Sequence, residues 1–256
     1  MSLDSHLVES LWDAANYYNE PGFIENDPIL IPHSFSNERD IELAGFFTAI
    51  IAWGQRKSII KNAKELFVRM DDSPYDFILN STEDDQKSLK GFVHRTFNDV
   101  DLIFLVKRLG QLLKESRSLE HVFFKDPNYS VESALINFRE NIFSSEFESK
   151  RTEKHIATPQ KNSACKRLNM YLRWMIRPND GVDFGIWKTV DPSILKMPLD
   201  THVIRVVHEL GIMHQLKGDW KGCLSLTEIF SEIHPSDPVF FDFALFGLGV
   251  NNRNMS

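Results

Sequence analysis

"KMPLDTHVIRVVHELGI", residues 196–212, has the pattern of a helix that is buried on one side. Its apolar residues recur at helical spacing, namely Val203, Ile204, Val206, Val207 and Leu210. Asp200 stands just before this stripe, where an aspartate commonly caps a helix and contributes about 1 kcal/mol. The sequence leaves two roles open for Asp200: a helix cap, or a carboxylate that takes part in chemistry.

Helical spacing extends over most of the chain. The segments that predict helices by their apolar stripes or their composition are 43–51, 60–70, 99–116, 130–143, 166–177 and 237–250. The last of these starts at Asp237-Pro238, and proline is favoured at the first helical position. Alternating strand patterns with tight-turn dipeptides are nearly absent. The pattern therefore predicts an all-α protein, with a polar linker at about residues 145–162.

Composition narrows the class of protein. A chain of 256 residues can form one large domain or two small ones. No apolar run approaches the roughly 18 residues that a membrane span needs, and the N-terminus lacks the pattern of an export signal. Two isolated cysteines exclude a disulfide framework and a four-cysteine zinc or iron–sulfur site. We expect a cytoplasmic protein with no membrane association and no cofactor or metal.

Positive charge is concentrated in one segment of an otherwise acidic chain. The net charge is −7, yet residues 150–177 contain eight basic residues and one acid, Glu153. This segment carries +7, so the remainder carries −14. A solvated basic face is one explanation, and contact with a polyanion such as DNA is the other.

Lys166 lies at the predicted start of the helix in "KNSACKRLNMYLRWMIRP", residues 161–178. Positive charge is unfavourable at that end of a helix because it opposes the helix dipole. A lysine there therefore costs some stability, which a functional role would explain. An ordinary exposed lysine is the alternative.

Three segments together resemble the helix–hairpin–helix DNA glycosylases of the endonuclease III type. "PLDTHVIRVVHELGI" resembles their V-D-T-H-V-x-R-V segment, and Asp200 falls on the catalytic aspartate. "KRLNMYLRWM" is similar to the K-T-A-N helix, and Lys166 falls on the catalytic lysine. "FTAIIAWGQRKSIIKNAKELF" resembles the early helix pair, with Gln55 on the lesion-proximal glutamine. The chain is also identified as a member of an uncharacterised bacterial family, domain of unknown function 2400.

The chain departs from the glycosylase pattern at two places. The glycine-rich hairpin that holds a DNA phosphate is replaced by "QKNSAC", residues 160–165, so Lys161 or Arg167 is expected to substitute for it. Lys166 and Asp200 are 34 residues apart, a spacing closer to the archaeal 8-oxoguanine glycosylases than to endonuclease III. Those archaeal enzymes also lack the iron–sulfur cluster.

The resemblance implies a bifunctional DNA glycosylase and AP lyase of base-excision repair that acts on an oxidised purine. Asp200 would stabilise the oxocarbenium-like transition state, and Lys166 would attack the anomeric carbon to form a Schiff base. The expected DNA contacts are Gln55, Arg56, Lys161, Arg167 and His202, although His202 could instead cap its helix. The flipped base would be lined by aromatic residues that could equally be core, among them Trp53, Trp174, Trp187 and Phe243, with Phe46 and Phe47 as further candidates.

The fold that the resemblance implies has two helical subdomains with the active site in the cleft between them. We expect residues 41–180 to form one subdomain and 1–40 with 181–256 to form the other, so that Lys166 and Asp200 face each other across the cleft. The partner would be double-stranded DNA containing a damaged base, bound by a monomer. Two other readings stay open: a non-catalytic helical nucleic-acid-binding protein, and a metal-dependent hydrolase built on His94, Asp99 and Asp101.

Overall fold

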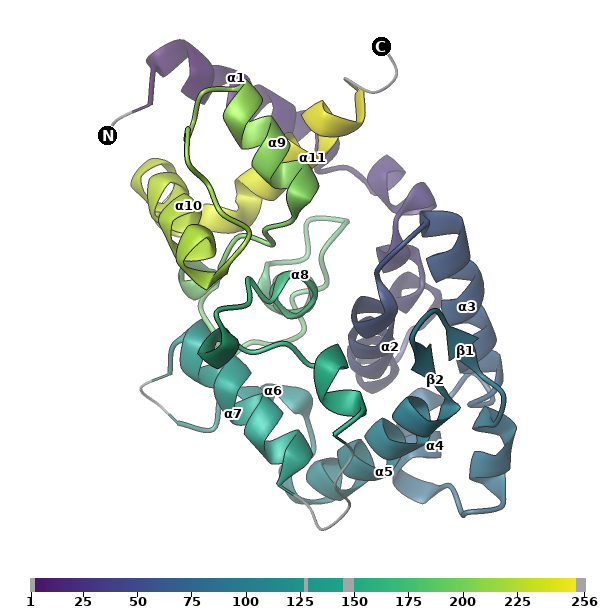
Figure 1. Cartoon of the computed structure of the whole chain (residues 1–256). Coiled ribbons are helices and arrows are strands. Elements are labelled where there is room, and N and C mark those ends of the chain that lie inside the picture. Colours follow the sequence, from purple (N-terminus) through teal and green to yellow (C-terminus); the bar gives the residue numbers. More distant parts are fainter. Residues whose placement is uncertain (1–2, 127–128, 145–149, 252–256) are drawn as a thin grey trace. The chain divides into compact units, whose positions relative to one another are not determined.

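The computed structural model of the chain describes residues 3–126, 129–144 and 150–251 and divides into two compact units (Figure 1). Unit 1 combines residues 1–24 with 158–256, and unit 2 comprises residues 25–157. The division after Ala157 falls within the stretch predicted as a linker. The predicted subdomains have other bounds: they placed residues 158–180 with 41–157 and residues 25–40 with 181–256, whereas 158–180 group with the C-terminal helices and 25–40 belong to unit 2.

Unit 2 is built from six α-helices and one short hairpin among its described residues. The helices are α2 (Glu38–Ile51), α3 (Arg56–Val68), α4 (Pro74–Asn80), α5 (Asp99–Ser116), α6 (Leu119–Phe123) and α7 (Val131–Phe143). The antiparallel hairpin pairs β1 (Val93–His94) with β2 (Phe97–Asn98). Shorter 3-10 turns are η2 (Pro28–Leu30), η3 (Pro32–Ser34), η4 (Asp85–Leu89) and η5 (Thr152–His155), and η1 (Pro21–Asn26) crosses from unit 1.

Helix α2 is buried along almost its whole length and forms the centre of unit 2. Its Glu42 is 1% exposed, which would be costly for an isolated carboxylate. The Glu42 Oε1 accepts hydrogen bonds from the Ser118 hydroxyl at 2.7 Å and from the Leu119 amide at 3.1 Å. A buried acid of α2 therefore fixes the start of α6.

Unit 1 contains the helices that carry Lys166 and Asp200. Its α-helices are α1 (Ser5–Tyr18), α8 (Lys166–Ile176), α9 (Thr201–Glu209), α10 (Trp220–Ile233) and α11 (Asp242–Asn251). Its 3-10 turns are η6 (Pro159–Lys161), η7 (Pro192–Ile194) and η8 (Pro238–Phe241). Helices α1 and α9 both pack against α11, as Figure 1 shows. This packing explains the apolar character of α11, whose residues Phe243–Leu245 are fully buried.

The last helix begins later than its sequence predicts. The apolar run was expected to be helical from Asp237-Pro238, but the chain first forms the 3-10 turn η8 and becomes α-helical only at Asp242. Asp242 is therefore in the first turn of α11, where a carboxylate is favourable against the helix dipole.

The long segment between α8 and α9 returns along α8. The Phe184 amide donates to the Trp174 carbonyl at 2.8 Å, and the Trp187 amide donates to the Met175 carbonyl at 2.9 Å. Between them Gly185 has φ +54°, and a Cβ there would lie 2.5 Å from the Arg177 carbonyl oxygen. Only glycine fits so close to the end of α8, which explains its place in this segment.

The helical prediction is confirmed, since the described elements are helices apart from one hairpin of two two-residue strands and an isolated bridge between Ser163 and Asp219. No helix within residues 3–126, 129–144 and 150–251 is long and apolar enough to cross a membrane. Part of the predicted linker, residues 145–162, is packed into unit 2, because Thr152, His155 and Ile156 are buried there. Residues 145–149 of the same stretch lie outside the described residues.

Candidate active site

Asp200 caps helix α9, as its sequence position predicts. Its Oδ1 accepts hydrogen bonds from the amides of His202 and Val203, both at 2.9 Å. The residue has extended backbone geometry, which is usual for an N-cap. One carboxylate oxygen is thus committed to the helix, and the other remains available for a second contact.

That second contact is with Lys166, the first residue of α8. The Lys166 Nζ lies 3.7 Å from the Asp200 Oδ2, and the two side chains are 33% and 38% exposed. The same amine lies 3.8 Å from the Met170 sulfur, one turn along α8. Lys166 and Asp200 therefore meet within unit 1, whereas the sequence placed them in different subdomains.

Helix α8 starts abruptly, which brings Lys166 to its first position. Cys165 has φ +49° and the left-handed conformation that residues other than glycine rarely adopt. Its amide is held by the Ser163 hydroxyl at 3.2 Å. The sharp turn at Cys165 lets the chain become helical immediately afterwards.

A second carboxylate, Asp242, belongs to the same neighbourhood, and it was not predicted from the sequence. Asp242 begins α11 and forms an ion pair with Arg173, two turns along α8 from Lys166. Burial raises the pKa of the Asp242 carboxyl, the charges of Arg173 and Lys166 oppose this shift, and the Asp200 carboxylate adds to it. The Asp242 carboxyl therefore interacts electrostatically with both Lys166 and Asp200. The one feature of the sequence that could have identified Asp242 is that it is an acid within an otherwise apolar helical segment.

Arg173 and Arg177 form a buried ionic network rather than an exposed basic face. Both guanidinium groups contact Asp183, which is 0% exposed. Arg177 also pairs with Asp237 at 2.9 Å and with Asp180 at 3.1 Å. Burial raises the pKa of the Asp183 carboxyl, and the two arginines partly oppose that shift.

The predicted basic segment is therefore only partly a surface for a polyanion. Besides the two buried arginines, Arg151 lies 3.3 Å from the Asp101 carboxylate. Arg167 is partly buried, and burial lowers its pKa to about 10. Lys161 is exposed. The sequence could not show this, because the neutralising acids are distant from the segment along the chain or lie in the loop that folds back on α8.

The His202 side chain contacts other residues of unit 1. Its Nε2 lies 3.4 Å from the Phe246 carbonyl oxygen, and its Nδ1 lies 3.5 Å from the guanidinium of Arg205. The ring centroid is 5.9 Å from that of Phe246. These contacts join the start of α9 to α11, and the predicted DNA contact of His202 stays a prediction.

The aromatic residues expected around a flipped base are largely core. Trp174 and Phe243 are 0% exposed and Trp187 is 2% exposed. The Phe243 ring lies under the Arg173 guanidinium at 4.5 Å, and Trp187 packs on Tyr171. In unit 2, Phe46 and Phe47 are likewise 0% exposed and pack edge to face on each other. A role in a base pocket remains a prediction for these residues.

Gln55, Arg56 and Trp53 lie in unit 2. Gln55 is the N-cap residue of α3 without a side-chain capping bond, and both Gln55 and Arg56 are exposed. Trp53 packs within unit 2, stacked on His155 at 5.6 Å and edge-on to His94 at 5.1 Å.

The three residues that suggested a metal-dependent hydrolase all make structural contacts. His94 binds the Trp53 carbonyl at 3.1 Å and Asn62 at 2.9 Å. Asp99 accepts from the Gly91 amide, and Asp101 completes a capping box with Asn98 at the start of α5. Throughout residues 3–126, 129–144 and 150–251, no group of three or more His, Cys, Asp or Glu side chains is arranged to hold a metal ion.

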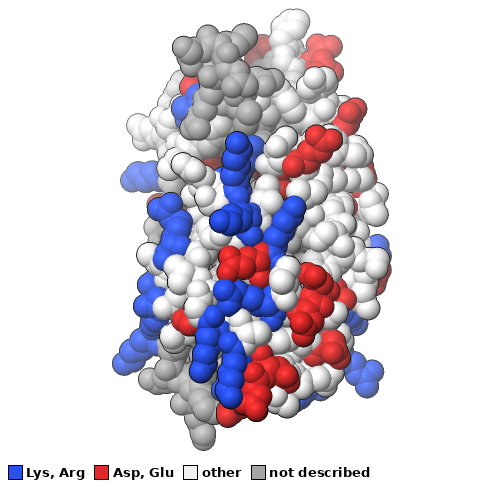
Figure 2. Space-filling view, turned by 90° about the vertical axis from the view of Figure 1, so that its right-hand side faces the viewer, with Lys and Arg blue, Asp and Glu red and all other residues white. Residues whose placement is uncertain are grey.

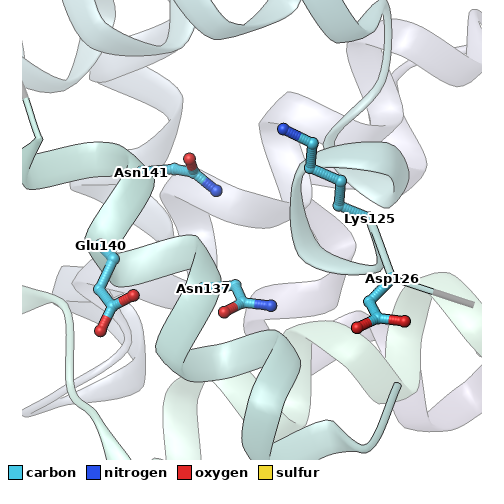
Figure 3. A pocket seen from close by; sticks show the side chains of 5 residues that line it. All are labelled: Lys125, Asp126, Asn137, Glu140 and Asn141. Carbon is cyan, nitrogen blue, oxygen red and sulfur yellow. The ribbon is translucent and has the colours of Figure 1, made fainter. Parts of the chain in front are cut away.

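One hollow of the described structure lies elsewhere, on unit 2. It has a volume of about 310 Å³ and is lined by Lys125, Asp126, Asn137, Glu140 and Asn141 (Figure 3). The last three lie on one face of α7, and the first two follow α6 (Figure 3). All five side chains are polar, whereas small-molecule sites are mostly apolar with a few polar groups. None of them was predicted as a site residue.

Comparisons with known proteins agree with the family suggested by the sequence. A search of curated proteins and a search of solved structures gave no match. The model of one family matches residues 27–251, which is most of the chain and includes Lys166, Asp200 and Asp242. The chain therefore belongs to DUF2400, a family described as proteins of unknown function.

Proposed function

We propose that this protein is a bifunctional DNA glycosylase and AP lyase in which Lys166 is the nucleophile and Asp200 the electrostatic partner. The observation that carries the proposal is the 3.7 Å approach of Lys166 Nζ to Asp200 Oδ2 at the starts of two helices. The resemblance to helix–hairpin–helix glycosylases assigns the same two positions.

The position of Lys166 suits a nucleophile. An amine must lose a proton before it attacks, and the Lys166 side chain, at the first position of α8, is 33% exposed and so remains open to a substrate. We assign that proton to the departing base, so that the Asp200 carboxylate keeps its charge during bond cleavage. The neutral Lys166 Nζ then forms a bond to the anomeric carbon of deoxyribose.

The position of Asp200 suits charge stabilisation. As the bond between sugar and base breaks, electrons leave with the base and positive charge develops on the sugar ring. A fixed carboxylate stabilises that charge, and Asp200 is fixed because its other oxygen caps α9. The departing base takes up a proton, the sugar ring opens to a Schiff base on Lys166, and β-elimination then breaks the strand on the 3′ side.

Borohydride trapping tests this proposal directly. The protein is incubated with duplexes that each contain one damaged base, with oxidised purines as the first candidates, and then reduced. A Schiff base is converted into a covalent protein–DNA adduct that survives denaturation. Wild-type protein should form the adduct on at least one duplex, and Lys166→Gln should form none. Absence of an adduct across oxidised, alkylated and deaminated bases and abasic sites contradicts the lyase.

The alternative is a non-catalytic nucleic-acid-binding protein. It is favoured by the complete burial of Trp174 and Phe243, which leaves those rings inaccessible to a flipped base in this structure. Under this alternative, the protein would bind duplexes with and without damage equally, and single-turnover assays would release no base from any of them.

A further inference from the structure

Helix α3 carries a concentrated run of exposed positive charge in unit 2. Residues 56–64 contain Arg56, Lys57, Lys61 and Lys64 and no acid. All four are exposed, although the whole chain has a net charge of −7. In the part of the chain that the structure describes, Lys57, Lys61 and Lys64 have no carboxylate within ion-pair distance. The side that carries α3 faces the viewer in Figure 2, where Lys and Arg side chains gather beside acidic ones.

The three lysines lie on one face of α3, opposite its core. They occupy positions i, i+4 and i+7, while Ile59, Ala63 and Leu66 are buried. Successive lysines are separated by about 6 and 4.5 Å along the helix axis, from a rise of about 1.5 Å per residue. We refer to Lys57, Lys61 and Lys64 as the α3 lysine row.

The residues next to the α3 lysine row do not neutralise its positive charge. Glu65 is the one acid of α3, and it pairs with Arg69 at 2.8 Å rather than with a lysine of the row. Arg95, at the turn of the hairpin with φ +56°, adds a further exposed cation. Its guanidinium would lie 2.9 Å from a Cβ on Gly54, so it is next to the start of α3.

The arrangement is unfavourable for the folded protein by itself. Lys57 is in the first turn of α3, where positive charge opposes the helix dipole, and that turn contains no acid. Like charges at i and i+4, as in Lys57 and Lys61, also repel each other. A polyanionic partner would remove both penalties.

We propose that the α3 lysine row and Arg95 form a surface that binds the phosphate backbone of double-stranded DNA. The inference rests on the proposed function, because that function makes DNA the polyanion that the protein meets. Lysine ammonium groups are compact charges that contact phosphates without reading sequence. This surface would add a DNA contact that the segment 150–177, with its buried arginines, supplies only in part.

The surroundings favour a duplex over other polyanions. Binding of single-stranded nucleic acid relies on exposed aromatic rings that stack on bases. The large exposed hydrophobic side chains described in unit 2 are the valines 68, 93 and 100, and none is aromatic. Protein interfaces instead centre on a desolvated core enriched in aromatic residues, which this surface also lacks.

The test compares two variants with the same net charge. In the first, Lys57, Lys61 and Lys64 are all changed to Gln. In the control, Lys87, Lys107 and Lys114 are changed to Gln, since all three are exposed in unit 2 and lie outside α3. Lys87 and Lys107 are already paired with Asp84 and Glu83. Binding to an undamaged duplex is measured by fluorescence anisotropy from low to moderate salt.

We expect the first variant to bind the duplex roughly tenfold or more weakly near 0.1 M salt, with the slope of log affinity against log salt reduced by about 0.9 for each lost phosphate contact. The control should keep the wild-type slope. Equal slopes for wild type and first variant, or an equal loss in the control, overturn the inference, as does tighter binding of the wild type to single-stranded DNA or an acidic peptide.

The outcome is separable from that of the proposed function. If trapping on damaged DNA succeeds and the lysine-row variant keeps the wild-type salt slope, the α3 surface is wrong and the glycosylase proposal stands. If the lysine row is needed for binding of undamaged duplex but nothing is trapped, the lyase is wrong and the α3 surface stands.

Discussion

The Asp200 carboxylate reaches Lys166 with the oxygen that it does not use for capping. Its Oδ1 accepts two amide hydrogen bonds at the start of α9, and its Oδ2 lies 3.7 Å from Lys166 Nζ at the start of α8. The cap therefore fixes the orientation of the charge that faces the amine. Structural and catalytic roles of Asp200 are compatible, and a single substitution can separate them.

Asp200→Asn should separate the cap from the charge. Asparagine caps a helix about as well as aspartate, so the free energy of unfolding should change little. The charge that faces Lys166 is lost, and single-turnover base excision should fall by a factor on the order of 100 or more. Urea unfolding and excision assays measure the two effects. Wild-type excision by Asp200→Asn would reduce Asp200 to a helix cap.

Lys166→Gln should abolish borohydride trapping and leave duplex binding nearly unchanged, because it removes the nucleophile and only one partly exposed charge. Lys221→Gln is the control, since Lys221 is exposed on α10 of the same unit and is assigned neither to the pair nor to DNA binding. Trapping should persist in the control. An adduct formed by Lys166→Gln would show that another amine of the protein is the nucleophile.

Asp183→Asn should destabilise the protein by about 3 kcal/mol, because it leaves the buried guanidinium groups of Arg173 and Arg177 without their shared counterion. Asp180→Asn is the matched control. Asp180 is 26% exposed, and Arg177 is its one ion-pair partner among the described residues. Asparagine keeps an oxygen for the amides of Val182 and Asp183, so the change should cost less than about 1 kcal/mol. Urea unfolding of both variants gives the comparison, and equal losses would contradict a dominant role for the buried acid.

The stability of Asp242→Asn relative to wild type should depend on pH. Burial raises the pKa of Asp242 above its ordinary 3.8. The folded wild type therefore holds this proton more tightly than the unfolded chain, and the resulting stabilisation is lost as pH rises through the raised pKa. Asparagine has no proton to lose, so the variant should gain stability relative to wild type over that range.

Urea unfolding of both proteins at a series of pH values from about 3.5 to 7 checks this sign. If the wild type instead becomes more stable relative to Asp242→Asn as pH rises, the ion pair with Arg173 has a larger effect on the Asp242 pKa than burial has.

Local sequence determined the helices and the cap. The apolar spacing after Asp200 predicted α9, and the amides of His202 and Val203 do bind the Asp200 carboxylate. Such features depend on residues within one or two turns of each other, where backbone geometry fixes the distances. The same applies to Lys166, whose place at the start of its helix was evident from "KNSACKRLNMYL".

Only the tertiary structure decided which charges are exposed and which meet. Arg173 and Asp242 are 69 residues apart, and no local pattern indicates that they pair. Arg173 and Arg177 belong to the most basic segment of the sequence, yet Asp183, Asp237 and Asp242 neutralise them in the interior of unit 1. A sequence gives the charge of a segment, but burial and ion pairing depend on how distant elements pack. The pairing of Lys166 with Asp200 was predicted through a family resemblance, and its position within unit 1 follows from the tertiary structure, which brings the starts of α8 and α9 together.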